Sequence, residues 1–327
     1  MKKYLLLPLL AVLPLLGACG QTAEFAVIDG AAATDGVITV EQRELALSAV
    51  YPEIKTADIY TADGRIIDAQ AAEVTLSRDG CLSVGDDSYD AVIGLLLDPP
   101  PAANTDVYAM ARERLQAGEQ VLILYLDGLG WDTWIYGLEQ GLTPHLAALN
   151  AQQAAACWPS ITPVNYAAMV SGQTPAASGV KQRGDRQLNA PTLFEHAAEQ
   201  GLSAAVIEGA AQILELGVTQ ELNPDDDGDG DTDDEVLAAA LAAMAEREYD
   251  LLFVHFHGID DVEHQYGPHS DQAYAKLAAT DAMAGQLLAA WPGAVIVCSD
   301  HGQHPTEDGG GHGDFRASDI LVPLLND

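Results

Sequence analysis

The sequence predicts an α/β protein built on a mainly parallel sheet with helices on both faces. From about residue 106 onward, short apolar runs alternate with alanine-rich helical stretches. Repeated alternation of this kind predicts strand–helix units, which pack as a parallel sheet covered on both sides. Ligands of such sheets bind beyond the carboxyl ends of the strands. The polar residues of interest in this chain follow those ends.

Apolar runs in this part of the chain predict four buried strands. They are Gln120–Asp127, Ala204–Glu208, Tyr249–His257 and Ala294–Ser299. The clearest helices are expected over Pro191–Gln200, which opens with a proline where a helix tolerates one, and over Asp271–Ala290. We assign residues 106–327 to this domain.

Residues 20–105 have a different pattern. Short apolar stretches alternate with turns such as Asp63-Gly64, which predicts a small, strand-containing accessory region at the N-terminal side. Asp98-Pro99-Pro100-Pro101 has the composition of a stiff linker. No group of residues in this region points to a particular chemistry.

The first 19 residues have the features of a lipoprotein signal peptide. Lys2 and Lys3 precede an apolar run, and Leu16-Gly17-Ala18-Cys19 closes it. This end resembles the lipobox of bacterial lipoproteins, in which cleavage leaves Cys19 as the lipidated N-terminus. An ordinary signal peptide or a membrane span is the alternative, but the run is short and contains two prolines. We expect an extracytoplasmic protein that contacts a bacterial membrane only through the lipid on Cys19.

The charge of the chain limits its partners. Its net charge is −35, from 49 acidic residues against 14 lysines and arginines. Such a surface repels nucleic acid, so nucleic acid binding is not expected. It also repels phosphate esters in general. Phosphate chemistry would therefore need a locally positive site, which metal ions provide.

Acidic residues and histidines recur where the predicted strands end. The set is Asp127, Asp260, His264, Asp300, His301 and, in a glycine-rich loop, His312. A single strand-end acid would mean little, because such residues often cap the next helix. Three carboxylates and three imidazoles together suit zinc or a related divalent ion. Asp260 and His264 are one helical turn apart, so a helix would place both on one face.

The segment Trp158–Gly172 resembles the nucleophile motif of type I phosphodiesterases and nucleotide pyrophosphatases, in the alkaline phosphatase superfamily. There a Pro-x-x-Thr turn leads into a helix that a Thr-Gly or Ser-Gly turn follows. Asp260–Pro268, Ser299–Gly302 and Gly311–Gly313 resemble the later elements of the same family, in the same order. The resemblance covers roughly residues 118–315. It implies an alkaline-phosphatase-like catalytic core.

The resemblance also implies the chemistry: a two-metal-dependent hydrolase of small phosphate esters, with a covalent phospho-threonine intermediate at Thr162. It assigns Asp260, His264 and His312 to one ion. It assigns Asp127, Asp300 and His301 to the other, with Thr162 bridging. Zinc is the expected metal and manganese the alternative. A threonine hydroxyl is a weak nucleophile unless its proton is removed or a metal replaces it, which agrees with this assignment.

Arg183 lies 21 residues after Thr162, where related phosphodiesterases often have an asparagine that holds a phosphoryl oxygen. An arginine there would grip phosphate bidentately and favour a phosphomonoester, so monoesterase activity is the first alternative. A solvated turn is the other interpretation of this residue. The interval from His301 to His312 is short for the family, which favours an open site and a small substrate.

Two further classes of protein stay open. A non-catalytic, lipid-anchored metal-binding relative would keep the fold without turnover. A sulfatase would use Cys157, because Cys157–Ile161 resembles the sulfatase signature, but Ile161 replaces its arginine. A packed thiol is the favoured interpretation of Cys157.

The acidic segment after residue 222 has the spacing of a calcium loop. The candidate ligands are Asn223, Asp225, Asp227, Asp231 and Asp234, with a glycine at the sixth position. A second register starts at Asp225 but ends on Val236. A solvated acidic loop is the alternative interpretation.

His255 and His257 are two apart on a predicted strand, so they point to one face. Packed core histidines are the favoured interpretation of both, with support of a metal ligand by one of them as the alternative.

Overall fold

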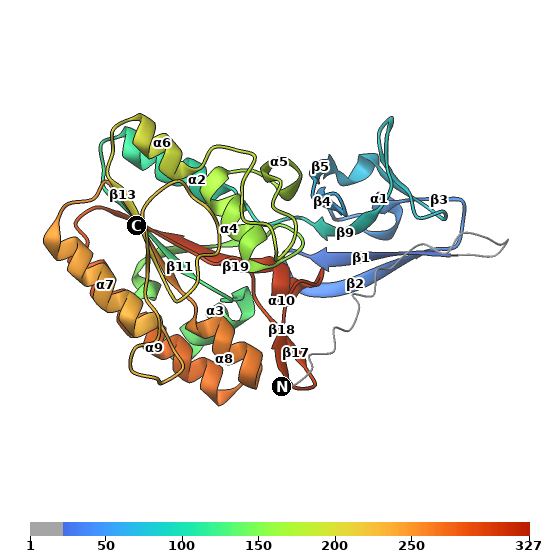
Figure 1. Cartoon of the computed structure of the whole chain (residues 1–327). Coiled ribbons are helices and arrows are strands. Elements are labelled where there is room, and N and C mark those ends of the chain that lie inside the picture. Colours follow the sequence, from blue (N-terminus) through green and yellow to red (C-terminus); the bar gives the residue numbers. More distant parts are fainter. Residues whose placement is uncertain (1–21) are drawn as a thin grey trace, which may run out of the picture.

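The computed structural model describes residues 22–327 (Figure 1). The lipobox and Cys19 lie outside the described residues, so the lipid anchor stays a prediction. Among residues 22–327, no helix combines the length and apolar character that a membrane crossing requires.

An eight-stranded sheet forms the larger part of the molecule, in the order β10-β12-β19-β16-β11-β15-β13-β14. Its strands are β10 Ala102–Ala103, β11 Val121–Leu126, β12 Asn150–Ala155, β13 Ala204–Glu208, β14 Gln220–Leu222, β15 Leu251–Phe256, β16 Ala294–Cys298 and β19 Leu321–Asn326. Only β19 runs antiparallel to its neighbours in this sheet. The mainly parallel sheet that the sequence predicts is confirmed.

Helices cover both faces of this sheet (Figure 1). The helices after residue 105 are α2 Asp106–Gln116, α3 Trp131–Gln140, α4 Thr162–Ser171, α5 Pro175–Ser178, α6 Leu193–Glu199, α7 Asp233–Glu246, α8 Gly258–Tyr266, α9 Asp271–Ala290 and α10 Ala317–Ile320, with a 3-10 turn at Leu146–Ala148. A second 3-10 turn, Ala71–Glu73, lies in the N-terminal region. Alternate residues of β11 face opposite ways: Ile123 packs in the layer with α2, α4 and α6, and Leu124 in the layer with α3, α7 and α9.

The predicted elements match closely, with one correction at a helix start. Helix α9 has the predicted bounds, and the four predicted strands are present within a residue or two. Helix α6 begins at Leu193, later than Pro191, because Thr192 is its N-cap. The Thr192 hydroxyl accepts from the Glu195 backbone N–H, and the Glu195 carboxylate accepts from the Thr192 N–H.

The N-terminal region forms two smaller antiparallel-rich sheets around their own core. Their elements are β1 Ala23–Asp29, β2 Thr34–Val40, β3 Glu44–Ala46, α1 Leu47–Val50, β4 Thr56–Thr61, β5 Ile66–Gln70, β6 Val74–Ser77, β7 Leu82–Val84, β8 Asp87–Tyr89 and β9 Val92–Leu97. The expectation of strands before residue 105 is confirmed. The boundary near residue 105 stays a prediction, because β10 already pairs in the large sheet.

The N-terminal strands contact the large sheet at specific points. The Tyr60 hydroxyl donates to the carbonyl of Ala156 at 3.2 Å, and the Ala317 N–H donates to the Asp35 carboxylate at 2.7 Å. The Phe315 ring packs edge-on against Tyr60, with 5.1 Å between ring centroids. The segment after His312 is therefore held by residues from the beginning of the chain.

A buried carboxylate fixes the start of helix α8. Asp233 accepts hydrogen bonds from the backbone N–H groups of His257 and Gly258 at 2.8 and 3.2 Å. Lys276, on α9, lies 2.8 Å from the same carboxylate, and both side chains are buried. This pair anchors the helix that carries Asp260 and His264.

We expect Asp233→Ala to lower the free energy of unfolding by about 2–4 kcal/mol, because it orphans two backbone donors and the buried Lys276 ammonium. Urea unfolding monitored by circular dichroism measures this change. Asp234→Ala is the matched control, since Asp234 is exposed in the same helical turn and should cost less than about 0.5 kcal/mol. Equal losses in the two variants would contradict the anchoring role of Asp233.

Candidate metal centre

The six predicted ligands come together at one edge of the large sheet. Asp127 follows β11, Asp300 and His301 follow β16, and Asp260 and His264 lie on α8 after β15. Because β11 is hydrogen-bonded to both β15 and β16, these strand ends are adjacent. His312 arrives from the hairpin of β17 His304–Thr306 and β18 Gly309–Gly311.

Thr162 opens helix α4 at the same edge. Ile161 is extended, Pro163 occupies the first turn, and Gly172 ends the helix in a left-handed conformation. The Thr162 Oγ1 lies 3.4 Å from His301 Nε2. The predicted nucleophile therefore faces the predicted ligands from the N-terminus of a buried helix, where backbone N–H groups favour an anion.

The ligand atoms form two overlapping groups, Asp127–Asp300–His301 and Asp260–His301–His312. His301 Nε2 lies 2.9 Å from Asp300 Oδ2 and 3.6 Å from Asp127 Oδ1. His312 Nε2 lies 3.9 Å from Asp260 Oδ1. His264 joins from the rim, with Nε2 3.3 Å from Asp260 Oδ2.

Backbone carbonyls orient all three histidines. The Nδ1 atoms of His264, His301 and His312 lie 3.1, 3.2 and 2.8 Å from the carbonyl oxygens of Gly310, Gly302 and Ser160. A carbonyl only accepts hydrogen bonds, so each Nδ1 carries a proton. In the neutral ring Nε2 then has a free lone pair, which is the state that ligates a metal.

The residues present fit a pair of divalent ions. The three Nε2 atoms face carboxylate oxygens, and two acceptors cannot approach without a proton or a cation between them. Two of those oxygens, Asp127 Oδ1 and Asp300 Oδ2, are buried and have no hydrogen-bond donor. Buried orphan acceptors are rare, and a cation would satisfy both.

The electrostatics of the protein without ions support the same conclusion. Burial, with Asp300 and Asp260 nearby, raises the pKa of Asp127 well above its ordinary value. Burial alone would lower the pKa of His301, but Asp300, Asp260 and Asp127 together raise it to about 10. Burial and His301 lower the pKa of His312 to about 3. The site thus concentrates negative charge around one protonated imidazole, and divalent ions would replace that proton.

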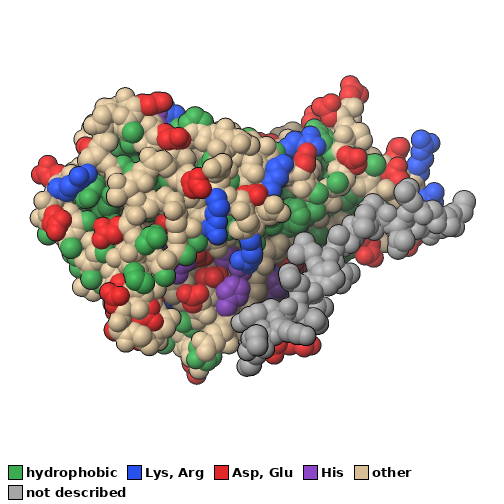
Figure 2. All heavy atoms as spheres, in the orientation of Figure 1, with side chains coloured by type: hydrophobic (Ala, Val, Ile, Leu, Met, Phe, Trp, Pro, Cys, Tyr) green, Lys and Arg blue, Asp and Glu red, His purple; other side chains and the backbone are tan. Residues whose placement is uncertain are grey.

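Arg183 lies at this site. Its Nη2 is 2.9 Å from His312 Nε2, while its neighbour Arg186 is turned away and donates to the backbone carbonyls of Gln212 and Ile213. Figure 2 shows a few basic side chains gathered near histidines on a face otherwise rich in acidic ones. The Arg183 side chain is exposed and contacts the same His312 nitrogen that a metal would take, so its role in gripping phosphate stays a prediction.

The predicted calcium loop stays a prediction. Two of its candidate ligands, Asp225 and Asp227, lie together with Asp229. Asn223 donates its side-chain amide to backbone carbonyls, and Asp231 pairs with the buried Lys276 ammonium of α9. The remaining candidate, Asp234, is exposed on α7.

Cys157 is packed in the core, and burial raises the pKa of its thiol to about 12. Its backbone N–H donates to the Asn165 carboxamide at 2.7 Å, which ties the segment before Thr162 to α4. A thiol of this kind is unreactive. The packed interpretation of Cys157 fits this surrounding.

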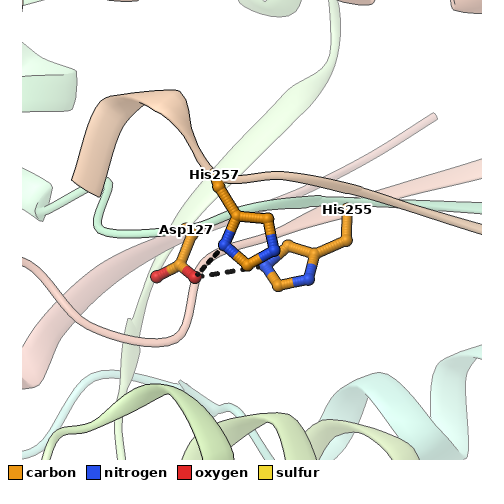
Figure 3. A group of neighbouring side chains, drawn as sticks. All are labelled: Asp127, His255 and His257. Carbon is orange, nitrogen blue, oxygen red and sulfur yellow. Dashed lines mark hydrogen bonds and ion pairs between the residues drawn. The ribbon is translucent and has the colours of Figure 1, made fainter. Parts of the chain in front are cut away.

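His255 and His257 take part in the site, which the favoured core-packing interpretation did not expect. His255 Nε2 and His257 Nδ1 each lie 3.2 Å from Asp127 Oδ2 (Figure 3). Their spacing could have indicated this role, because residues two apart at the end of a strand face the same side. That side is the one occupied by Asp127, which follows the neighbouring strand β11.

The sequence profile of the type I phosphodiesterase / nucleotide pyrophosphatase family matches residues 121–322. The matched segment contains every predicted metal ligand and Thr162. The chain therefore belongs to this family.

Relatives of the chain include the catalytic subunit of human GPI ethanolamine phosphate transferase 2, 24% identical over 235 residues. That match covers 63% of this chain and 23% of the human protein, so the chain spans about a quarter of its relative. Similar solved structures include phosphonoacetate hydrolase from Sinorhizobium meliloti 1021 with phosphonoformate, at 20% identity and a TM-score of 0.47. Murine ectonucleotide pyrophosphatase / phosphodiesterase 5 has 16% identity and a TM-score of 0.48, and each match covers 57% of both chains.

We expect chelation to lower the melting temperature, and zinc or manganese to restore it. An ion that binds only the folded state stabilises it by about 2.7 kcal/mol at one hundred times its dissociation constant.

His264→Ala should bind about one metal equivalent fewer per chain, measured by mass spectrometry of the metal-loaded protein. His269→Ala is the control, since His269 is half-exposed and pairs with Asp132. Unchanged metal content in His264→Ala would remove this residue from the ligand set.

Proposed function

We propose that this protein is a two-metal-dependent phosphoric ester hydrolase that acts through a covalent phospho-threonine at Thr162. Asp260, His264 and His312 hold one divalent ion. Asp127, Asp300 and His301 would hold the other, with the Thr162 hydroxyl beside His301. Zinc is the favoured metal, since imidazole and carboxylate ligands in a small site suit it, and manganese is the alternative.

The observation that carries this proposal is the position of Thr162 Oγ1, 3.4 Å from His301 Nε2, at the N-terminus of a buried helix. A threonine buried for packing alone would have no reason to face three imidazoles and three carboxylates. Family membership supports the same class of reaction.

Bound divalent ions would supply positive charge that stabilises the threonine alkoxide, the phosphoryl oxygens and the leaving oxygen. The residues of the chain carry out the following steps. Thr162 Oγ gives up its proton to solvent and forms a bond to phosphorus, while the bond to the leaving oxygen breaks and that oxygen takes up a proton from solvent. The N-terminus of α4 directs backbone N–H groups at the phosphoryl group. Water then attacks phosphorus, releases phosphate or a phosphomonoester, and restores the Thr162 hydroxyl.

Arg183 adds a preference among substrates. Its guanidinium lies beside the His312 ring, and a guanidinium can donate two parallel hydrogen bonds to a phosphoryl group. A monoester presents one more charged oxygen than a diester. We therefore propose a small substrate and a higher relative rate with phosphomonoesters than an asparagine at this position would give.

The lipoprotein interpretation is likewise a proposal. It places the enzyme outside the cytoplasm, anchored to a bacterial membrane through a lipid on Cys19. Expression of Cys19→Ser in a bacterial host should abolish incorporation of labelled palmitate, and full labelling of the variant would refute the anchor.

We expect Thr162→Ala to lower kcat for p-nitrophenyl phosphate by more than about a thousandfold, because the nucleophile is lost. Thr162→Ser keeps a hydroxyl at the same position and should retain measurable turnover. Metal content, measured on both variants, should stay close to that of the unmodified protein. Activity of Thr162→Ala at the unmodified level would refute the nucleophile, and no activity in the unmodified, metal-loaded protein would favour a non-catalytic relative.

Paired assays with p-nitrophenyl phosphate and bis-p-nitrophenyl phosphate test Arg183. Arg183→Ala should lower kcat/KM for the monoester about tenfold more than for the diester, because a charged hydrogen bond is lost. Arg186→Ala is the matched control, since its guanidinium binds carbonyls outside the site. Equal losses for the two esters would leave Arg183 without a role in selectivity.

A further inference from the structure

Asp127 uses only one of its two carboxylate oxygens in the centre described above. Oδ1 faces His301 at 3.6 Å, and Oδ2 faces the opposite way, toward His255 and His257. The two imidazoles come from the end of β15 and converge on this one oxygen (Figure 3). Asp127, His255 and His257 therefore form a second cluster of ligand atoms, all within 4.8 Å of one another.

The hydrogen-bonding capacity of His255 is not satisfied by the protein. The side chain is fully buried, and its Nδ1 has no hydrogen-bond partner. Glu208 Oε2 lies 3.8 Å from this Nδ1 and is also buried and without a hydrogen-bond partner. A neutral His255 that donates from Nε2 to Asp127 turns its Nδ1 lone pair toward Glu208. A neutral His255 protonated on Nδ1 turns its Nε2 lone pair toward Asp127. With both carboxylates ionised, either tautomer leaves two acceptors facing each other in the interior, at a cost of desolvation.

A cation between His255 Nε2 and Asp127 Oδ2 removes this conflict. Nδ1 then carries the proton and points at the Glu208 carboxylate. A metal-bound imidazole backed by a carboxylate is the usual arrangement for histidine ligands in proteins.

The distances also suit a metal ion. Both nitrogens lie 3.2 Å from Asp127 Oδ2. Ligands about 2.0–2.1 Å from a tetrahedral zinc ion are separated by about 3.3 Å from one another. The His257 side chain is 20% exposed, so water reaches this member of the cluster.

We propose that Asp127, His255 and His257 form a third metal site for a zinc-like divalent ion, next to the two-metal centre and joined to it by the Asp127 carboxylate. In sharing Asp127 this site rests on the proposed function. Glu208 is a positioning residue that holds the His255 ring.

Metal counting on the full chain tests the proposal. The metal-free protein is equilibrated with excess zinc, the free metal is removed, and bound zinc per chain is measured by mass spectrometry. We expect three equivalents in the unmodified protein and in His269→Gln, and two in the double variant His255→Gln/His257→Gln. The single variant His257→Gln changes a partly exposed side chain and should keep its fold. It should bind the third equivalent at least about tenfold more weakly.

Cobalt gives a second measurement on the same proteins. The third equivalent of Co²⁺ should add visible absorption in the unmodified protein, and His257→Gln should lose that increment. Two equivalents in both the unmodified protein and His257→Gln, with identical cobalt spectra, would overturn the third site and leave the histidines as hydrogen-bond partners of Asp127.

The outcomes separate this site from the two-metal centre. Asp260→Asn combined with His264→Gln removes ligands of the centre only. Metal that this variant retains, and that His255→Gln/His257→Gln loses, supports the third site even if the unmodified protein binds fewer than three ions. Absence of any bound metal in the unmodified protein would overturn both proposals.

Discussion

Mutual repulsion among buried carboxylates is the constraint on which the rest of this structure depends. Asp127 and Asp300 are fully buried at the ends of neighbouring strands, and Asp260 is next to them at the start of α8. Groups of like charge in a low-dielectric interior are costly unless cations compensate them. The sheet forces them together because β15, β11 and β16 are parallel and adjacent. The two hydrophobic layers that flank these strands supply the free energy that holds the arrangement.

The chain surrounds this charge with groups that have a fixed direction. Backbone carbonyls hold the Nδ1 atoms of the three histidine ligands, and Gln303 donates to the Asp260 carboxylate at 2.7 Å. Asp300 Oδ1 accepts from the Gly128 backbone at 3.1 Å. Such contacts leave little freedom for the rings or carboxylates to move, so the predicted ligands already hold fixed positions in the protein without ions.

Local sequence patterns made most of the fold and the location of the candidate site predictable. Apolar runs and alanine-rich stretches predicted the sheet and its helices, and strand-end acids predicted where the site lies. Contacts that depend on distant residues were not predictable. The pairing of Asp231 with the buried Lys276 is one such contact, and the contact of His255 with Asp127 on the neighbouring strand is another. The start of α6 was placed too early at Pro191, because the Thr192 side chain caps the helix and so fixes Leu193 as its first residue.

The contacts of the N-terminal strands bear on how such a protein changes over evolution. Tyr60 and Asp35, which hold the segment after His312, lie outside the residues matched by the family. Mutations in the first hundred residues can therefore reshape the surroundings of the centre without altering a single ligand. Part of the wall around the centre and the side chains at its middle are thus encoded by separate stretches of one gene.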